Sequence, residues 1–198
     1  MKILIIATPR TGSTYFSNTI SKNYNLKHFF EPKLDTSFDD IICNDNIVVK
    51  IMTGDIYRYY QMETKLSIED STNLLCERLS KYKFDNIILL HRKNKKEHIE
   101  ALINLKRVWG RGDEPVNTEW VIDNEFKKYA TKEQVNIYTN HIDTSFQILD
   151  TISKKLQLPI TYYEDLYYNT ESVDLQGLEF KPDLSKKLRK EIKPNTII

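Results

Sequence analysis

Short apolar segments rich in β-branched residues alternate with longer amphipathic segments along this chain, and few folds accommodate that alternation. The segment Lys2–Ala7 is apolar almost throughout, and an unbroken apolar run of this length is typical of a strand buried on both faces. Four further strands are predicted, at His28–Phe30, Ile47–Met52, Asn86–Leu90 and Pro159–Tyr163, and Asn86–Leu90 also lacks polar alternation.

Helices are predicted between these strands. One should cover Ser13–Lys22, and a second should follow Ser67, a favourable N-cap residue. A third should begin near Asn94, and a fourth opens with the capping box Thr131–Gln134. Strands that alternate with helices predict an α/β fold with a P-loop-like parallel sheet and helices on both faces, in three α/β/α layers. The 198 residues are expected to form a single domain, 1–198.

Composition excludes several functional classes. The formal net charge is +1, so the chain lacks the broad basic field of a nucleic-acid-binding protein. No apolar stretch approaches the roughly 20 residues of a membrane span, and the first apolar run is too short for a secretory signal. The two cysteines, Cys43 and Cys76, are expected to be reduced thiols. We therefore expect a soluble, cytoplasmic protein that binds neither nucleic acid nor membrane.

The loop Thr8–Thr14 connects the first predicted strand to the first predicted helix. A helix N-terminus offers unpaired N–H groups to an anion, and Gly12 would let the backbone approach a phosphate closely. Ser13 and Thr14 add hydroxyl groups, and Arg10 adds a permanent positive charge. From this chemistry alone, the loop is either an anion site or an ordinary strand–helix turn with Arg10 at the surface.

The loop departs from the pattern of nucleoside triphosphatases. That pattern, Gly-x4-Gly-Lys-[Ser/Thr], cradles the phosphates of a magnesium nucleotide. The loop here lacks both the first Gly and the Lys, which disfavours magnesium-dependent hydrolysis of ATP or GTP. A P-loop-type kinase for nucleotides or other small molecules stays an alternative, because the same topology would serve it.

Polar residues occur at or just after the ends of all five predicted strands. Because ligands of open parallel sheets bind beyond the carboxyl ends of the strands, these residues are expected to share one site. They are Arg10, Glu31, Thr53, His91 and Glu164.

Pro9–Thr14 resembles the 5′-phosphosulfate loop of sulfotransferases that use 3′-phosphoadenosine 5′-phosphosulfate (PAPS). Their loop has the pattern Pro-[Arg/Lys]-[Ser/Thr]-Gly-[Ser/Thr]-Thr, and this chain matches it at every place. Other segments resemble the bacterial and carbohydrate-type members of that family, in the same order along the chain. They are Glu31-Pro32, Val48–Met52, Ile87–Arg92 and Tyr163–Leu166.

The resemblance implies transfer of a sulfuryl group from PAPS to a hydroxyl or amine of a small-molecule or glycan acceptor, with a carbohydrate favoured. Arg10 is the candidate that stabilises the transferring group, Glu31 the candidate general base, and Lys50 the candidate that assists the leaving group. Glu31 before a proline is equally common in turns, and Lys50 could instead extend from a strand end toward water. No metal is expected. The expected ligands of PAPS or adenosine 3′,5′-bisphosphate are Arg10, Thr11, Gly12, Ser13, Thr14, Tyr15 and Arg92.

One segment departs from the family pattern. A serine about two helical turns after Arg92 should help to bind the 3′-phosphate, but the corresponding region reads Ile99-Glu100-Ala101-Leu102. Lys95, Lys96 or a residue of 106–111 could compensate, and His98 is expected to be a surface residue of the helix. A degenerate relative that binds a partner or glycan without catalysis is therefore a third hypothesis. Residues 54–64 and 110–117 are expected to shape the acceptor pocket.

Overall fold

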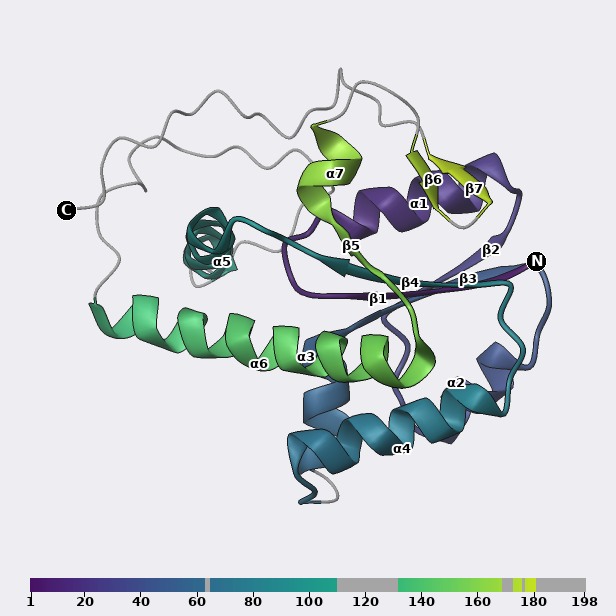
Figure 1. The fold of residues 1–198 in the computed structure, drawn as a ribbon, viewed down its shortest axis with the longest axis horizontal. Coiled ribbons are helices and arrows are strands. Elements are labelled where there is room, and N and C mark those ends of the chain that lie inside the picture. The colour runs from purple at the N-terminus through teal and green to yellow at the C-terminus, as the bar shows by residue number, and fades with distance from the viewer. Residues whose placement is uncertain (63–64, 110–131, 169–172, 176, 181–198) are drawn as a thin grey trace.

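The computed structural model describes residues 1–62, 65–109, 132–168, 173–175 and 177–180. Its centre is a five-stranded sheet with the order β2-β3-β1-β4-β5 (Figure 1). Every neighbouring pair in this sheet is parallel. The strands are β1 (Lys2–Ala7), β2 (Lys27–Phe30), β3 (Ile47–Met52), β4 (Asn86–His91) and β5 (Ile160–Tyr162).

One face of the sheet is covered by α1 (Ser13–Asn23), by α7 (Tyr163–Tyr167) and by a hairpin of β6 (Val173–Leu175) and β7 (Leu178–Phe180). The core on this face joins alternate residues of β1 to apolar residues of the covering elements. Its fully buried members include Ile3, Ile5, Phe16, Ile20, Leu166 and Phe180.

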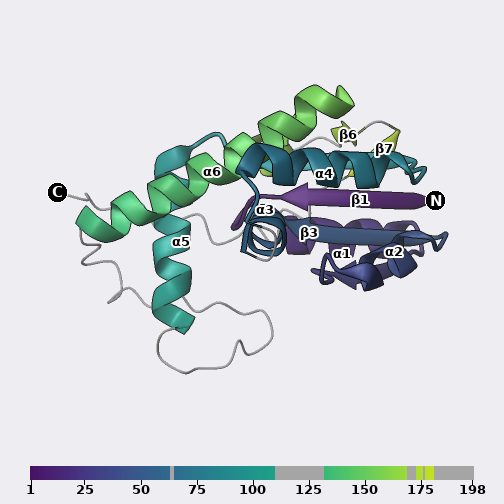
Figure 2. The same ribbon diagram turned by 90° about the horizontal axis from the view of Figure 1, so that it is seen from below.

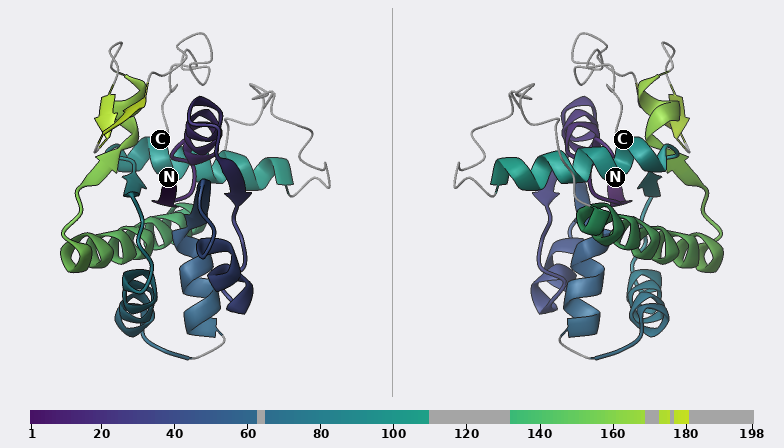
Figure 3. Two further views of the ribbon diagram at one scale, coloured as in Figure 1. Left: turned by 90° about the vertical axis from the view of Figure 1, so that its right-hand side faces the viewer. Right: turned by 90° about the vertical axis from the view of Figure 1, so that its left-hand side faces the viewer.

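The opposite face is covered by α2 (Thr36–Ile42), α3 (Thr53–Ile56), α4 (Ile68–Ser80) and α6 (Lys132–Leu156). Figure 3, which looks along the strands, shows α1 on one side of the sheet and α4 and α6 on the other. The core of this second face includes Leu4, Ile6, Phe38, Leu75, Leu149 and Ile152. Helices on both faces of a parallel sheet confirm the predicted three-layer α/β fold.

Helix α5 (Lys95–Trp109) stands apart from these layers. It is seen end-on in Figure 1 and lengthwise in Figure 2, beyond the carboxyl ends of the central strands. Its first turns therefore lie near the loops that follow β1 and β4.

Several elements were not predicted. Helices α2, α3 and α7 and the π-helical segment Tyr57–Met62 have at most seven residues each, which is too short for a reliable period of 3.6. The strands of the β6–β7 hairpin have only three residues each. The predicted cap at Ser67 is confirmed, because its side chain accepts a hydrogen bond from the backbone N–H of Asp70. The predicted capping box begins at Thr131, which lies outside the described residues.

The loop after β1 occupies a special place in this topology. The helix that follows β1 lies on one face of the sheet, whereas the helices that follow β2 and β3 lie on the other. Connections that leave adjacent strands toward opposite faces open a space at the carboxyl ends of those strands, and ligands of α/β proteins bind there. No helix within the described ranges is long and apolar enough to cross a membrane.

Candidate functional site

The loop Thr8–Thr14 adopts a backbone conformation that only particular residues tolerate easily. Arg10 and Gly12 have φ angles of 63° and 68°. The left-handed region costs a residue other than glycine about 1–2 kcal/mol, and such strain is concentrated at functional sites. Gly12 is also the N-cap of α1, which has no side-chain cap and no acidic residue in its first turn. No N-cap side chain therefore accepts a hydrogen bond from the N–H groups at the start of α1.

Arg10 and Arg92 bring positive charge to this end of the sheet. Burial lowers the pKa of the Arg10 guanidinium, and the nearby charge of Arg92 lowers it further. Two cations near each other in a partly buried place favour the binding of an anion, because an anion relieves their repulsion.

The other expected ligands near the loop, Thr11, Ser13, Thr14 and Tyr15, have different surroundings. The buried Thr11 hydroxyl donates to the carbonyl of Thr8 at 2.8 Å, so it braces the loop. The Ser13 hydroxyl lies 4.0 Å from the Met52 sulfur. Thr14 is exposed and accepts a hydrogen bond from Lys50. The ring of Tyr15 packs against that of Tyr167, with centroids 6.1 Å apart.

Lys50 joins the loop to the end of β2. Its side chain is almost fully buried, and its Nζ lies 2.6 Å from Glu31 Oε1 and 3.1 Å from Thr14 Oγ1. The same ammonium lies 4.0 Å from the centre of the Phe30 ring, which is a cation–π contact. Three of the predicted site residues, from β3, the end of β2 and α1, therefore meet in one cluster.

Burial and the neighbouring carboxylate act in opposite directions on the charge of Lys50. Burial lowers the pKa of Lys50, and the hydrogen bond and charge of Glu31 oppose that shift. Glu31, directly after β2, has a φ angle of 47°, so it shares the left-handed conformation with Arg10, which lies three residues after β1. We call the side chains of Thr14, Glu31 and Lys50 the Lys50 cluster.

Asp55 is a second carboxylate near the Lys50 cluster, and sequence reasoning missed it. It lies in α3, where it accepts a hydrogen bond from the backbone N–H of Met52 at 3.1 Å. Burial raises the pKa of Asp55, and the charge of Glu31 raises it further while Lys50 opposes the shift. The residue three positions before it is a methionine, which is not a favoured N-cap residue, so the sequence carries no capping signal for Asp55.

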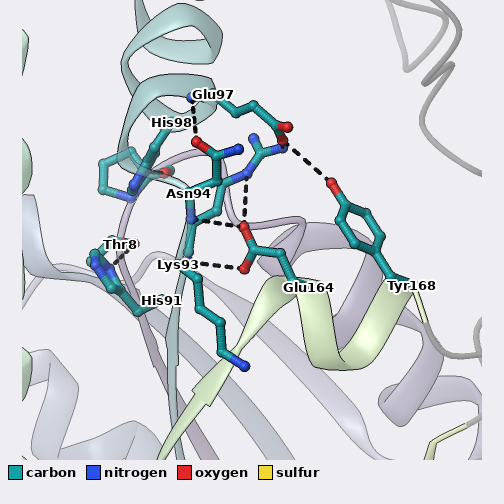
Figure 4. A network of polar contacts seen from close by, with 10 residues as sticks. Thr8, His91, Lys93, Asn94, Glu97, His98, Glu164 and Tyr168 are labelled. Carbon is teal, nitrogen blue, oxygen red and sulfur yellow. Dashed lines mark hydrogen bonds and ion pairs between the residues drawn. The ribbon is translucent and has the colours of Figure 1, made fainter.

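Arg92 follows β4 and is held by acidic side chains. Its guanidinium lies 3.1 Å from Glu97 and 3.7 Å from Glu164, and it stacks at 4.5 Å over the Tyr163 ring. Glu164 also accepts hydrogen bonds from the backbone N–H groups of Lys93 and Asn94, directly before α5, as Figure 4 shows. Glu164 therefore caps the start of α5 from the end of the sheet.

The expectation that His98 is a surface residue is wrong. His98 is fully buried, and its Nε2 is hydrogen-bonded to the carbonyl oxygen of Pro9. His91 is also buried, and its Nδ1 lies 3.1 Å from the Thr8 hydroxyl. Their rings meet edge to face with centroids 5.6 Å apart. The sequence did contain a signal, since Leu102, four residues after His98, is also buried and continues the same face of α5.

The remaining expected residues are placed as follows. Thr53 is fully buried at the start of α3, and its hydroxyl has no hydrogen-bond partner among the described residues. Lys95, suggested as a compensating phosphate ligand, pairs with Asp143 at 2.6 Å. The segment 110–117 lies outside the described residues, while 54–62 forms α3 and the π-helical segment. Within the described ranges, no group of three His, Cys, Asp or Glu side chains could hold a metal ion.

Comparison with known proteins adds little to this geometry. No family model matches the chain, and no curated protein matches it either. Among solved structures, the YorR protein of Bacillus subtilis, in complex with phosphorylated GDP, is similar over 81% of this chain and 84% of its own. The sequence identity is 12% and the TM-score is 0.42, so this likeness carries no argument about function.

Proposed function

We propose that the protein is a sulfotransferase that transfers a sulfuryl group from PAPS to a hydroxyl or amine of an acceptor, with a carbohydrate favoured. The Lys50 cluster is the observation that carries this proposal. It joins a hydroxyl of the anion loop, a buried ammonium and a carboxylate within hydrogen-bonding distance. Such a set can hold an anionic donor on one side and accept a proton from an acceptor on the other.

The loop fits the 5′ end of the donor. The first turn of α1 has no side-chain cap and no acidic residue, and Arg10 lies in the loop three residues after the end of β1. In this proposal Arg10, Gly12, Ser13 and Thr14 bind the 5′-phosphosulfate, which supplies the sulfuryl group when PAPS is bound. Lys50 neutralises charge that develops on the leaving phosphate, because its buried ammonium acts in a poorly solvated place.

Glu31 acts on the acceptor in this proposal. As the acceptor oxygen or nitrogen forms its bond to sulfur, the bond from sulfur to the bridging phosphate oxygen breaks, and adenosine 3′,5′-bisphosphate leaves. The proton of the acceptor goes to the Glu31 carboxylate. About a third of this side chain is exposed, 35%, so an acceptor can reach it from solvent while Lys50 holds its other side.

Arg92 is the proposed ligand of the 3′-phosphate, and its acidic partners set a condition on that role. Glu97 is the more exposed of the two, at 41% against 13% for Glu164. The 3′-phosphate therefore replaces Glu97 rather than Glu164, which also caps the start of α5. Removing the charge of Glu97 should tighten the binding of adenosine 3′,5′-bisphosphate and leave that of adenosine 5′-monophosphate unchanged.

The direct test is turnover. The purified protein is incubated with PAPS and a panel of sugars that carry free hydroxyl or amino groups, and both adenosine 3′,5′-bisphosphate and the sulfated product are measured. Arg10→Ala should abolish turnover. Glu31→Gln should lower turnover by about 100-fold or more, while its affinity for the bisphosphate stays within about twofold of the wild-type value.

Glu69→Gln is the matched control, because Glu69 is an exposed carboxylate in the first turn of α4, on the opposite face of the sheet. It should turn over PAPS at the wild-type rate. If Arg10→Ala or Glu31→Gln also matched the wild type, that residue would have no part in the reaction. Failure of the wild-type protein to bind the bisphosphate would refute the proposal as a whole.

A further inference from the structure

Three carbonyl oxygens between Thr8 and Gly12, in the loop before α1, accept hydrogen bonds from side chains. The carbonyl of Thr8 accepts from the Thr11 hydroxyl at 2.8 Å, and that of Gly12 from the Tyr167 hydroxyl at 3.0 Å. The carbonyl of Pro9 is bonded to Nε2 of His98. Carbonyl oxygens repel an anion, whereas N–H groups bind it. A loop that binds a phosphate must therefore turn these oxygens away from it.

Peptide geometry makes these contacts directional. No cis peptide bond occurs in the part of the chain that the structure describes. In a planar trans peptide, the C=O and the following N–H point in opposite directions. The contact between Pro9 and His98 therefore directs the N–H of Arg10 away from α5. The Gly12 carbonyl also accepts the N–H of Phe16 at 3.0 Å. The first turn of α1 and the contact with Tyr167 together direct the N–H of Ser13, the first residue of α1, away from α7.

The chemistry of His98 suits this task. A carbonyl oxygen only accepts, so Nε2 of His98 carries the proton, and Nδ1 has no partner among the described residues. Burial lowers the pKa of His98 to about 4, so the ring is neutral near pH 7. The charged or titratable groups that face it are His91 and Arg92 at the end of β4 and Glu164 of α7. His98 can thus donate to the loop without adding a charge of its own.

Tyr167 contacts the loop with both its hydroxyl and its ring. Burial raises the pKa of Tyr167 well above its ordinary value, so the hydroxyl stays protonated. It donates a hydrogen bond to the Gly12 carbonyl. A Cβ atom at Gly12 would lie 3.0 Å from Cε2 of the Tyr167 ring. The glycine in the loop and the tyrosine of α7 are therefore fitted to each other, although 155 residues separate them.

We propose that His98 and Tyr167 are positioning residues, which hold the Pro9 and Gly12 carbonyls away from the anion site so that the N–H groups of the loop face the 5′-phosphosulfate. This inference rests on the proposed function for the identity of the anion. Neither residue belongs to the sequence motifs that suggested the donor. Thr11 performs the same task within the loop itself.

The test compares two nucleotides by calorimetry at pH 7.5. In Tyr167→Phe and His98→Leu, adenosine 3′,5′-bisphosphate should bind about tenfold more weakly than in the wild type, a change that equals about 1.4 kcal/mol. His98→Gln keeps an N–H donor at that place and should stay within about threefold of the wild type. Adenosine 3′-monophosphate lacks the 5′-phosphate, so its affinity should be the same in all four proteins.

Three results would overturn the inference. One is an unchanged bisphosphate affinity in a folded Tyr167→Phe or His98→Leu protein. Another is equal losses for both nucleotides, since a general disturbance of the fold does not distinguish them. The third is a His98→Gln protein that binds as weakly as His98→Leu while its thermal unfolding matches that of the wild type.

A measurement without nucleotide separates this inference from the proposed function. In ¹⁵N spectra of the ligand-free protein at pH 7, His98 should be neutral and protonated on Nε2. The amide resonance of Arg10 should move in His98→Leu and return in His98→Gln, and that of Ser13 should move in Tyr167→Phe. A charged or Nδ1-protonated His98, or unmoved amides, would refute the positioning role even if the bisphosphate binds.

Discussion

The Lys50–Glu31 pair allows a quantitative prediction about stability. Two unit charges 2.6 Å apart attract by about 6 kcal/mol at an effective dielectric constant of about 20. Water screens part of this attraction, because 35% of the Glu31 side chain is exposed while Lys50 is almost completely enclosed. Glu31→Gln leaves a buried ammonium without its counter-charge. We expect it to lower the free energy of unfolding by about 2–3 kcal/mol, less than the about 3–5 kcal/mol of a fully buried pair.

Lys50→Met should behave differently. It removes the buried charge, keeps most of the apolar volume, and leaves a carboxylate that water can reach. Lys50→Met should change the free energy of unfolding by less than about 1 kcal/mol, since replacing a buried charge by an apolar group is often neutral. The double variant should resemble Lys50→Met, so the coupling energy of the cycle should be about 2 kcal/mol.

Urea denaturation at pH 7, followed by circular dichroism, gives the free energy of unfolding of the wild type, the two single variants and the double variant. The four values can be compared provided that the m-values agree. The decisive quantity is the asymmetry between the two single variants. Equal costs for Glu31→Gln and Lys50→Met, or a coupling energy below about 0.5 kcal/mol, would show that the ammonium does not depend on Glu31 and would refute this reasoning.

Two further predictions concern the loop and the histidines beneath it. Gly12→Ala should lower the free energy of unfolding by at least about 1–2 kcal/mol and abolish nucleotide binding. The φ angle of Gly12 is 68°, and a Cβ at this position would press on Tyr167. Gly54→Ala is the control that should be neutral, because a Cβ there meets nothing within 4 Å. His91 and His98 have pKa values of about 4 in the folded protein against 6.5 ordinarily, so the unfolded chain binds more protons between these values. Unfolding free energy should be highest above about pH 6.5 and fall toward pH 4 by up to about 3 kcal/mol per ring, and a pH-independent stability in urea titrations would contradict the buried, neutral state.

The sheet was predictable because its strands are buried on both faces. The segments Lys2–Ala7 and Ile47–Met52 are apolar except for Lys2 and Lys50, and they coincide with β1 and β3. Segments without polar alternation indicate burial on both faces. The short elements α2, α3 and α7 were not predicted, because four to seven residues contain fewer than two helical turns. The side chains that fix α2 come from far along the chain, such as Arg78 of α4, which bonds Asp39.

The site was predictable only where each residue could be judged from its own neighbours in the sequence. Strand ends placed Arg10 and Glu31 at the same edge of the sheet as the loop, and Lys50 was named because it lies in β3. That Lys50 pairs with Glu31 and Thr14 depends on the order of β2, β3 and β1 and on the docking of α1. Such pairings are set by the fold and have no local signal.

His98 and Tyr167 show the same limit from the other direction. Each looks like an ordinary helix residue in sequence. His98 contacts Pro9, 89 residues earlier in the chain, and Tyr167 contacts Gly12, 155 residues earlier. Burial of a polar side chain is informative only when its partner is known. For His98 that partner is a carbonyl of the loop, which sequence alone does not reveal.

The central claim, that the loop and Arg92 bind the two ends of one nucleotide, is tested most directly by calorimetry with adenosine 3′,5′-bisphosphate. The wild-type protein should bind it more tightly than adenosine 5′-monophosphate. Arg10→Ala should bind neither nucleotide. Arg92→Gln should bind the bisphosphate only as tightly as the monophosphate, whose affinity should stay at the wild-type value. Tighter binding of ATP with magnesium than of the bisphosphate would contradict the account and favour a kinase instead.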